Sequence, residues 1–151
     1  MTPEAIGAVK VSYEAVAARP RQLASRFYEE LFTVDPNLRR LFPQDLTTLQ
    51  GHFEAALALV IRNLDEVRVL HGSLRELGAQ HVHWGARPED YVTAREALIG
   101  AVRGLSSNWD ARLEGQWRAA ITSIIVPMLE GAAVHTAVMA ERLAEDMSEA
   151  G

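Results

Sequence analysis

The stretch that decides the fold lies in the middle of the chain, at residues 77–91, and reads LGAQHVHWGARPEDY. A helical apolar pattern leads into this stretch and carries His81, and Gly85 indicates where that helix stops. Pro88 suits the first turn of a following helix. Counting from His81, Pro88 comes seven residues later and Tyr91 ten residues later. The stretch therefore predicts a helix that ends just after a histidine, a short turn, and a second helix with a tyrosine near its start.

The rest of the chain shows the same helical punctuation. Apolar residues recur at spacings of three and four, and prolines or capping residues separate the segments. No segment shows the apolar and polar alternation of a half-buried strand, so we expect an all-α fold. The expected helices cover about residues 3–16, 21–34, 36–42, 48–64 with a cap at Thr47 or Thr48, 65–83, 88–105, and 108 or 110 to a kink at Pro127.

The segment after Pro127 has a different character. Residues 128–147 are rich in Ala, Leu, Met and Glu, so they are helix-prone, but their apolar side chains are mostly small. They fit an extra helix, a frayed tail or a lead into another module. We therefore expect a main domain at residues 1–127 and a C-terminal helical extension or tail at 128–151.

Composition excludes several classes of protein. The chain has 151 residues with 48% hydrophobic residues, enough for one domain with a core. Its net charge of −5 disfavours nucleic acid, and with no cysteine it has no disulfide and no thiolate site. The N-terminus lacks a signal-peptide pattern, and the longest apolar run, residues 119–129, is too short to cross a bilayer. We expect a cytoplasmic protein without a membrane partner.

The central stretch resembles the proximal segment of bacterial single-domain globins and of the globin domain of flavohaemoglobins. Upstream, the run FYEELF at residues 27–32 leads through Pro36 to Leu41 and Phe42, and it is similar to the second and third helices of the same family. The resemblance covers roughly residues 6–127. It implies a globin fold around a haem pocket, with the C-terminal segment as an addition. It also implies non-covalent haem b, because the cysteines of a covalent attachment are absent.

The resemblance assigns His81 as the proximal ligand of the haem iron. A flat porphyrin must be held between two helices, and His52, which lies 29 residues before His81, suits the helix on the opposite face. His52 can donate a hydrogen bond to a gas, bind the iron as a sixth ligand, or point to solvent. His83 points about 200° around the helix from His81, so these two cannot bind one ion together.

Four further residues are expected at the haem. Tyr28 points into the distal pocket as a hydrogen-bond donor, or it is a buried tyrosine bonded to a carbonyl. Phe42 packs on the porphyrin edge or belongs to the plain core. Ala56 stands where relatives generally carry a bulkier aliphatic residue, which predicts a roomier distal side. Leu77 is expected to line the proximal face.

Tyr91 matches a tyrosine that in flavohaemoglobins orients the proximal histidine together with a glutamate of the last helix. Here the matching position is Val134, and Glu130 lies one turn earlier. Without that glutamate the electron density pushed toward the iron is smaller, so we expect weak peroxidase behaviour.

These observations favour a globin that reversibly binds a diatomic gas: dioxygen, nitric oxide or carbon monoxide. Enzyme activity is open: nitric oxide dioxygenase turnover needs an external reductase, because no Gly-x-Gly-x-x-Gly pattern marks one here. The alternative is a gas-sensing or redox-sensing module that signals through its C-terminal helix. A third hypothesis, a globin fold without haem that acts as an interaction domain, is disfavoured by the histidines and Tyr28. A monomer and a homodimer are both compatible with the sequence.

Overall fold

The structure, a computed structural model, describes the backbone of residues 1–150 and the side chains of residues 1–149. Within residues 1–150 there are helices and no strands, so the predicted all-α fold is confirmed. The elements are α1 (Pro3–Val16), α2 (Gln22–Val34), the 3-10 helix η1 (Pro36–Leu41), α3 (Thr47–Arg62), the 3-10 helix η2 (Leu64–Leu70), α4 (His71–His83), α5 (Pro88–Leu105) and α6 (Ala111–Ala150).

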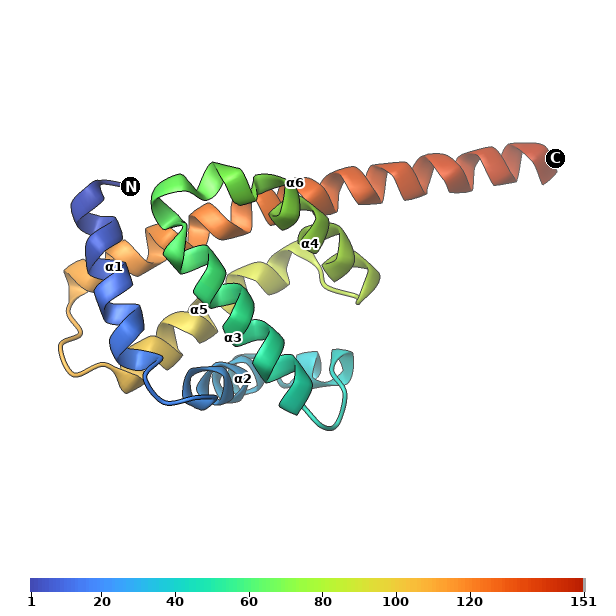
Figure 1. The fold of residues 1–151 in the computed structure, drawn as a ribbon. Helices are drawn as coiled ribbons and strands as arrows, with labels where there is room; N and C mark the ends of the chain where they lie inside the picture. Colours follow the sequence, from blue (N-terminus) through green and yellow to red (C-terminus); the bar gives the residue numbers. More distant parts are fainter. Residues whose placement is uncertain (151) are drawn as a thin grey trace.

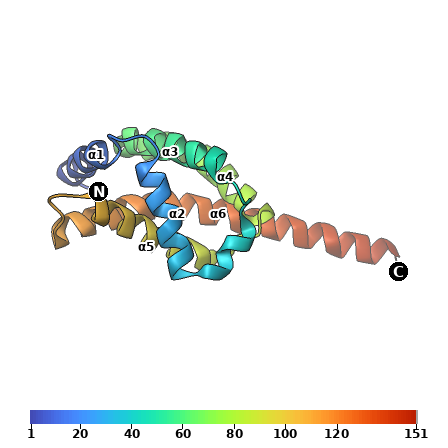
Figure 2. The ribbon, with the colours of Figure 1, turned by 90° about the horizontal axis from the view of Figure 1, so that it is seen from below.

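The helices pack around one main core (Figures 1 and 2). The helix α2 packs on α5, and the first half of α6 packs on α1, α4 and α5. Trp117, Ile99 and Val102 are fully buried at the centre. The two histidine-bearing helices have different supports: α3 rests on α2 and α1, whereas α4 rests on α6. The helix that carries His52 and the helix that carries His81 are therefore held in place by different parts of the core.

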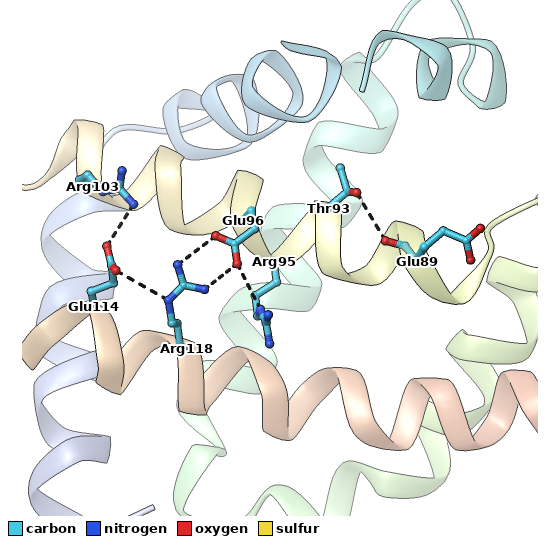
Figure 3. Close-up of polar contacts among 7 residues, drawn as sticks. All are labelled: Glu89, Thr93, Arg95, Glu96, Arg103, Glu114 and Arg118. Atoms are coloured by element: carbon cyan, nitrogen blue, oxygen red, sulfur yellow. Dashed lines mark hydrogen bonds and ion pairs between the residues drawn. The ribbon is translucent and has the colours of Figure 1, made fainter. Parts of the chain in front are cut away.

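Two polar contacts tie the last helix into the fold. The buried Trp117 donates its indole N–H to the hydroxyl of Ser12 at 3.0 Å, which joins α6 to α1. Arg118 of α6 donates from Nη2 to Oε2 of Glu96 on α5 at 2.9 Å (Figure 3). Glu114, one turn before Arg118 on α6, forms a second ion pair with the same guanidinium. The side chains of Glu114 and Arg118 are therefore directed toward α5, where they pair with Arg103 and Glu96.

The end of α4 follows the sequence prediction. Gly85 has φ of 96°, the left-handed conformation that glycine adopts without strain. The amide of Ala86 donates to the carbonyl of His81 at 2.9 Å, and the Gly85 amide donates to Val82 at 3.0 Å. The helix stops where the glycine predicts, and this fixed turn positions the last turn of α4.

Two predicted boundaries are wrong. Thr47 is the first helical residue and not a cap, because Asp45 accepts its amide at 3.0 Å from two residues upstream. The helix predicted over residues 65–83 is two elements, since Glu66 has non-helical angles and η2 separates α3 from α4. Helical periodicity does not distinguish one α-helix from a 3-10 turn followed by another helix.

The helix α6 continues through Pro127 as one 40-residue element, where we expected a kink. Met128 and Gly131, just beyond the proline, are buried against α4, and this packing supports the helix on both sides of Pro127. By length and composition alone, α6 also contains a window apolar enough to cross a membrane. Of that window, 28% is buried inside the protein.

Candidate functional site

The proximal side of the site is centred on His81, in the last turn of α4. Its Nδ1 lies 2.8 Å from the carbonyl oxygen of Leu77. A carbonyl only accepts, so Nδ1 carries the proton and Nε2 keeps its lone pair. Burial lowers the pKa of His81, and the bond to Leu77 opposes that shift. The side chain is therefore a neutral imidazole in a fixed tautomer, with one nitrogen available as a metal ligand.

Two aromatic residues flank this imidazole. The ring centroid of Trp84 lies 5.1 Å from that of His81, and the centroid of Tyr91 lies 6.0 Å away. Tyr91 is buried, and its hydroxyl has no hydrogen-bond partner among the described residues. The structure thus brings His81 and Tyr91 together as the sequence suggests. It adds Trp84, which spacing alone did not single out.

The last helix supplies no carboxylate to this cluster. Val134 is exposed, and Glu130 pairs with Arg75 at 3.2 Å on the surface. The Glu130 carboxylate therefore pairs with Arg75 and not with the Tyr91 hydroxyl. The weak peroxidase behaviour expected without an orienting glutamate stays a prediction.

Tyr28 is buried within a group of phenylalanines from α2, α3 and the end of η1. Its ring lies 5.2 Å from Phe27, 5.7 Å from Phe42 and 6.0 Å from Phe32, and Phe27 stacks on Phe53 at 4.4 Å. Burial raises the pKa of Tyr28. Its phenol is therefore neutral at physiological pH and able to donate. Phe53 belongs to the same group and was missed, because a helix-face aromatic next to His52 gives no signal beyond ordinary core.

The remaining distal candidates lie on α3. His52 and Ala56 are one turn apart, and both are exposed on this helix. Neither belongs to the Tyr28 group or to the His81 group. The distal roles of His52 and Ala56, and the roomier distal side expected at Ala56, therefore stay predictions.

Two glycines hold the proximal helix against α6. A Cβ at Gly78 would lie 1.9 Å from the carbonyl oxygen of Met128, and one at Gly131 would lie 1.9 Å from that of Arg75. Only glycine permits backbones to approach this closely. A glycine in a helix interior costs about 1 kcal/mol relative to alanine, so its presence signals such packing, but the sequence does not say against which helix. The helix that carries His81 is therefore seated directly on α6.

These residues fit haem. A single protein imidazole is a sufficient ligand for a metal that arrives with its other ligands, as haem iron does. The unpartnered hydroxyl of Tyr91 is a buried polar group of the kind that a bound cofactor or a reoriented ligand satisfies. Leu77 and Phe42, both half-buried, offer apolar contact on the two sides. The donor set and its surroundings are compatible with an all-α haem-binding protein.

The chain belongs to the globin family, whose model, described as Globin, matches residues 25–128. It is 23% identical over 126 residues to the Anaerobic nitrite reductase NSHB5 of Oryza sativa subsp. indica, covering 79% of this chain and 87% of that protein. It is 28% identical over 108 residues to a flavohemoprotein of Deinococcus radiodurans, covering 70% of this chain but only 27% of that protein.

Solved structures agree with the fold. A protein of Pseudomonas aeruginosa PAO1, described as structurally highly homologous to a human hemoglobin, superposes with a TM-score of 0.75 at 24% identity, covering 85% of this chain and 98% of its own. The globin fold is thus confirmed. Family membership supports haem as the cofactor and a diatomic gas as the ligand.

Proposed function

We propose that this globin holds haem b non-covalently, with His81 as the proximal iron ligand, and reversibly binds dioxygen, nitric oxide or carbon monoxide. The observation that carries the proposal is the half-buried, neutral imidazole of His81, whose Nδ1 is anchored on Leu77. When bound, haem supplies an iron centre that takes up a diatomic gas and exchanges single electrons.

The chain supplies orientation and hydrogen bonding around that centre. Trp84 and Tyr91 restrict the rotation of the His81 ring, because both lie within aromatic contact of it. On the distal side, Tyr28 offers a neutral phenol within an apolar group, which stabilises partial negative charge on a ligand. His52 offers a second donor or a competing ligand, and Ala56 leaves space beside it. Phe42 and Leu77 provide apolar contact for the ring.

The test is the visible spectrum of the full-length, haem-loaded protein, ferric and then reduced, before and after carbon monoxide. The His81→Ala substitution should abolish or shift the Soret band, whereas His83→Ala, two residues away and exposed, should leave it unchanged. Two sharp visible bands in the reduced protein, removed by His52→Ala, would identify His52 as a sixth ligand. Failure of the wild type to bind stoichiometric haem would overturn the proposal.

Turnover of nitric oxide with dioxygen is the enzymatic form of this proposal. One nitric oxide, one dioxygen and one electron balance to one nitrate, so each cycle consumes an electron. The flavohemoprotein is about four times longer than the region it shares with this chain, and we propose that a separate reductase serves here. The test is nitrate formation on mixing reduced protein, dioxygen and nitric oxide, with and without a flavin reductase. Stoichiometric nitrate from a single turnover supports it, and none contradicts it.

A sensing function is the second candidate, and the contact between α4 and α6 favours it. Because Gly78 and Gly131 allow no space between these helices, a displacement of His81 along α4 is transmitted to α6. The measurement is hydrogen exchange of residues 131–149 with and without carbon monoxide. A ligand-dependent change supports sensing, and identical exchange contradicts it.

A further inference from the structure

The outer face of α6 offers a surface whose role does not depend on haem binding. The inner face of this helix packs into the core through Trp117, Ile121 and Met128, all buried. The C-terminal part of the helix projects from the body into solvent (Figures 1 and 2), and residues 136–149 are all exposed. At 1.5 Å per residue, residues 131–149 extend about 30 Å.

The outer face carries an unbroken uncharged stripe, which we call the outer seam. Its ten positions follow one another at alternating intervals of four and three residues, the spacing of a coiled-coil seam. All ten are exposed except the half-buried Leu129. The positions are Gly115, Ala119, Thr122, Val126, Leu129, Ala133, Thr136, Ala140, Leu143 and Met147.

A solvent-facing helix surface ordinarily carries charged residues. Near the C-terminal end of α6 the outer seam carries apolar residues instead, and charged residues lie on the line of the inner face. In the extension, Arg142, Glu145 and Glu149 continue the line of the inner face, while Leu143 and Met147 lie on the outer seam with 59% and 77% exposure. In the body, the charged Arg118 and Glu114 are turned to α5 (Figure 3). Only 28% of the apolar window of α6 is buried. Leu129 packs partly against the core cluster of Tyr91 and Met128, whereas the other nine seam positions are exposed.

We propose that a second copy of this chain covers the outer seam, with the two α6 helices antiparallel. Residues 131–149 carry four carboxylates and one arginine, whereas residues 111–130 carry two of each charge. A parallel pair would place the two acidic extensions side by side. An antiparallel pair places each extension along the neutral half of the other and separates the two acidic ends by more than a Debye length of about 8–10 Å.

Side-chain size favours the same arrangement. Small residues occupy the middle of the outer seam, at Ala133 and Thr136, and larger ones lie on both sides of them. An antiparallel pair centred there sets Val126 of one copy opposite Leu143 of the other, and Leu129 opposite Ala140. In this register the eight seam positions from Thr122 to Met147 face one another over about 38 Å. With their flanking residues they approach the roughly 20 residues a side of a stable interface.

The first experiment is sedimentation of the full-length protein, wild type and variants. We expect a wild-type dimer, and a dimer dissociation constant raised at least about tenfold by Leu143→Glu, because each dimer carries the change twice. The matched control is Val134→Glu, equally exposed on the same helix but off the seam, which should leave the dimer intact. A wild-type monomer would overturn the proposal, as would equal effects of the two substitutions. A monomer that binds vesicles of phosphatidylcholine and phosphatidylglycerol, and loses this binding with Leu143→Glu but not with Val134→Glu, would also overturn the proposal and assign the outer seam to a membrane surface.

Orientation is tested by cross-linking, since the chain has no cysteine of its own. Val126→Cys and Leu143→Cys proteins are oxidised separately and as a mixture. The antiparallel pair predicts a disulfide only in the mixture, because the bridged Cα atoms must lie within about 7 Å. Cross-linking of each variant with itself would contradict the antiparallel arrangement.

Discussion

Replacing Gly131 with alanine should separate α4 from α6. The new Cβ would lie 1.9 Å from the Arg75 carbonyl oxygen and 2.5 Å from its carbonyl carbon. Ordinary contact begins at 3.4 Å, so the two backbones must move apart by about 1.5 Å. Gly115→Ala in the same helix is the matched control, since its Cβ meets nothing within 4 Å.

The two substitutions are expected to change the free energy of unfolding in opposite directions. In both, alanine in place of glycine favours the helix by about 1 kcal/mol. At Gly115 nothing opposes this gain. At Gly131 the overpacking cost exceeds the usual 1–3 kcal/mol, because the obstacle is backbone and not a flexible side chain. We expect a net loss of about 2 kcal/mol in the free energy of unfolding.

Urea unfolding, followed by the helical circular dichroism of the haem-loaded protein, measures both effects. With a slope of about 2 kcal/mol per molar urea, the midpoint should rise by about 0.5 M for Gly115→Ala and fall by about 1 M for Gly131→Ala. Because α4 carries His81, the Gly131→Ala protein should also show an altered haem spectrum. A Gly131→Ala midpoint equal to or above that of Gly115→Ala would refute the close packing of the two helices.

Further predictions concern the buried and paired groups. Trp117→Phe removes the bond to Ser12 and leaves a small void, which should cost about 2–3 kcal/mol by urea unfolding; an unchanged midpoint would contradict the buried bond. Burial raises the pKa of Tyr28 above 10.0, so its stabilisation is present below pH 10 and lost as the pH rises further; the Tyr28→Phe protein should lose stability less steeply there. The bond from Arg118 lowers the pKa of Glu96 below 4.5, so this pair stabilises the fold above that pH and the contribution is lost in acid. Glu96→Gln should cost less than about 1 kcal/mol at pH 7 because the pair is partly exposed, and a cost that persists in strong acid would rule out the ion pair as its origin.

The parts of the fold that were predicted from the sequence depend on local chemistry. Gly85 ends α4 because only glycine enters its left-handed turn without strain, and Pro88 begins α5 because its fixed φ suits a first turn. The resemblance placed Tyr28 and Phe42 separately at the haem, and the structure brings their rings to 5.7 Å. His81 and Tyr91 are likewise close neighbours.

The parts that were not predicted depend on contacts between distant segments. The approach of Gly78 to Met128 joins helices far apart in the sequence, and no local pattern names the partner. The position of Trp84 against His81 depends on how the turn after α4 closes. The path of α6 through Pro127 depends on α4, which packs against the residues that follow the proline.

The most direct test of the account is chemical rescue of the His81→Gly protein with imidazole. The account predicts that the apoprotein variant loaded with haem lacks the wild-type reduced spectrum and regains it, together with carbon monoxide binding, as imidazole is added. His83→Gly, treated in the same way, should retain the wild-type spectrum without imidazole. A His81→Gly protein with an unaltered spectrum, or one that imidazole does not restore although its helical content is intact, would contradict the assignment of His81 as the iron ligand.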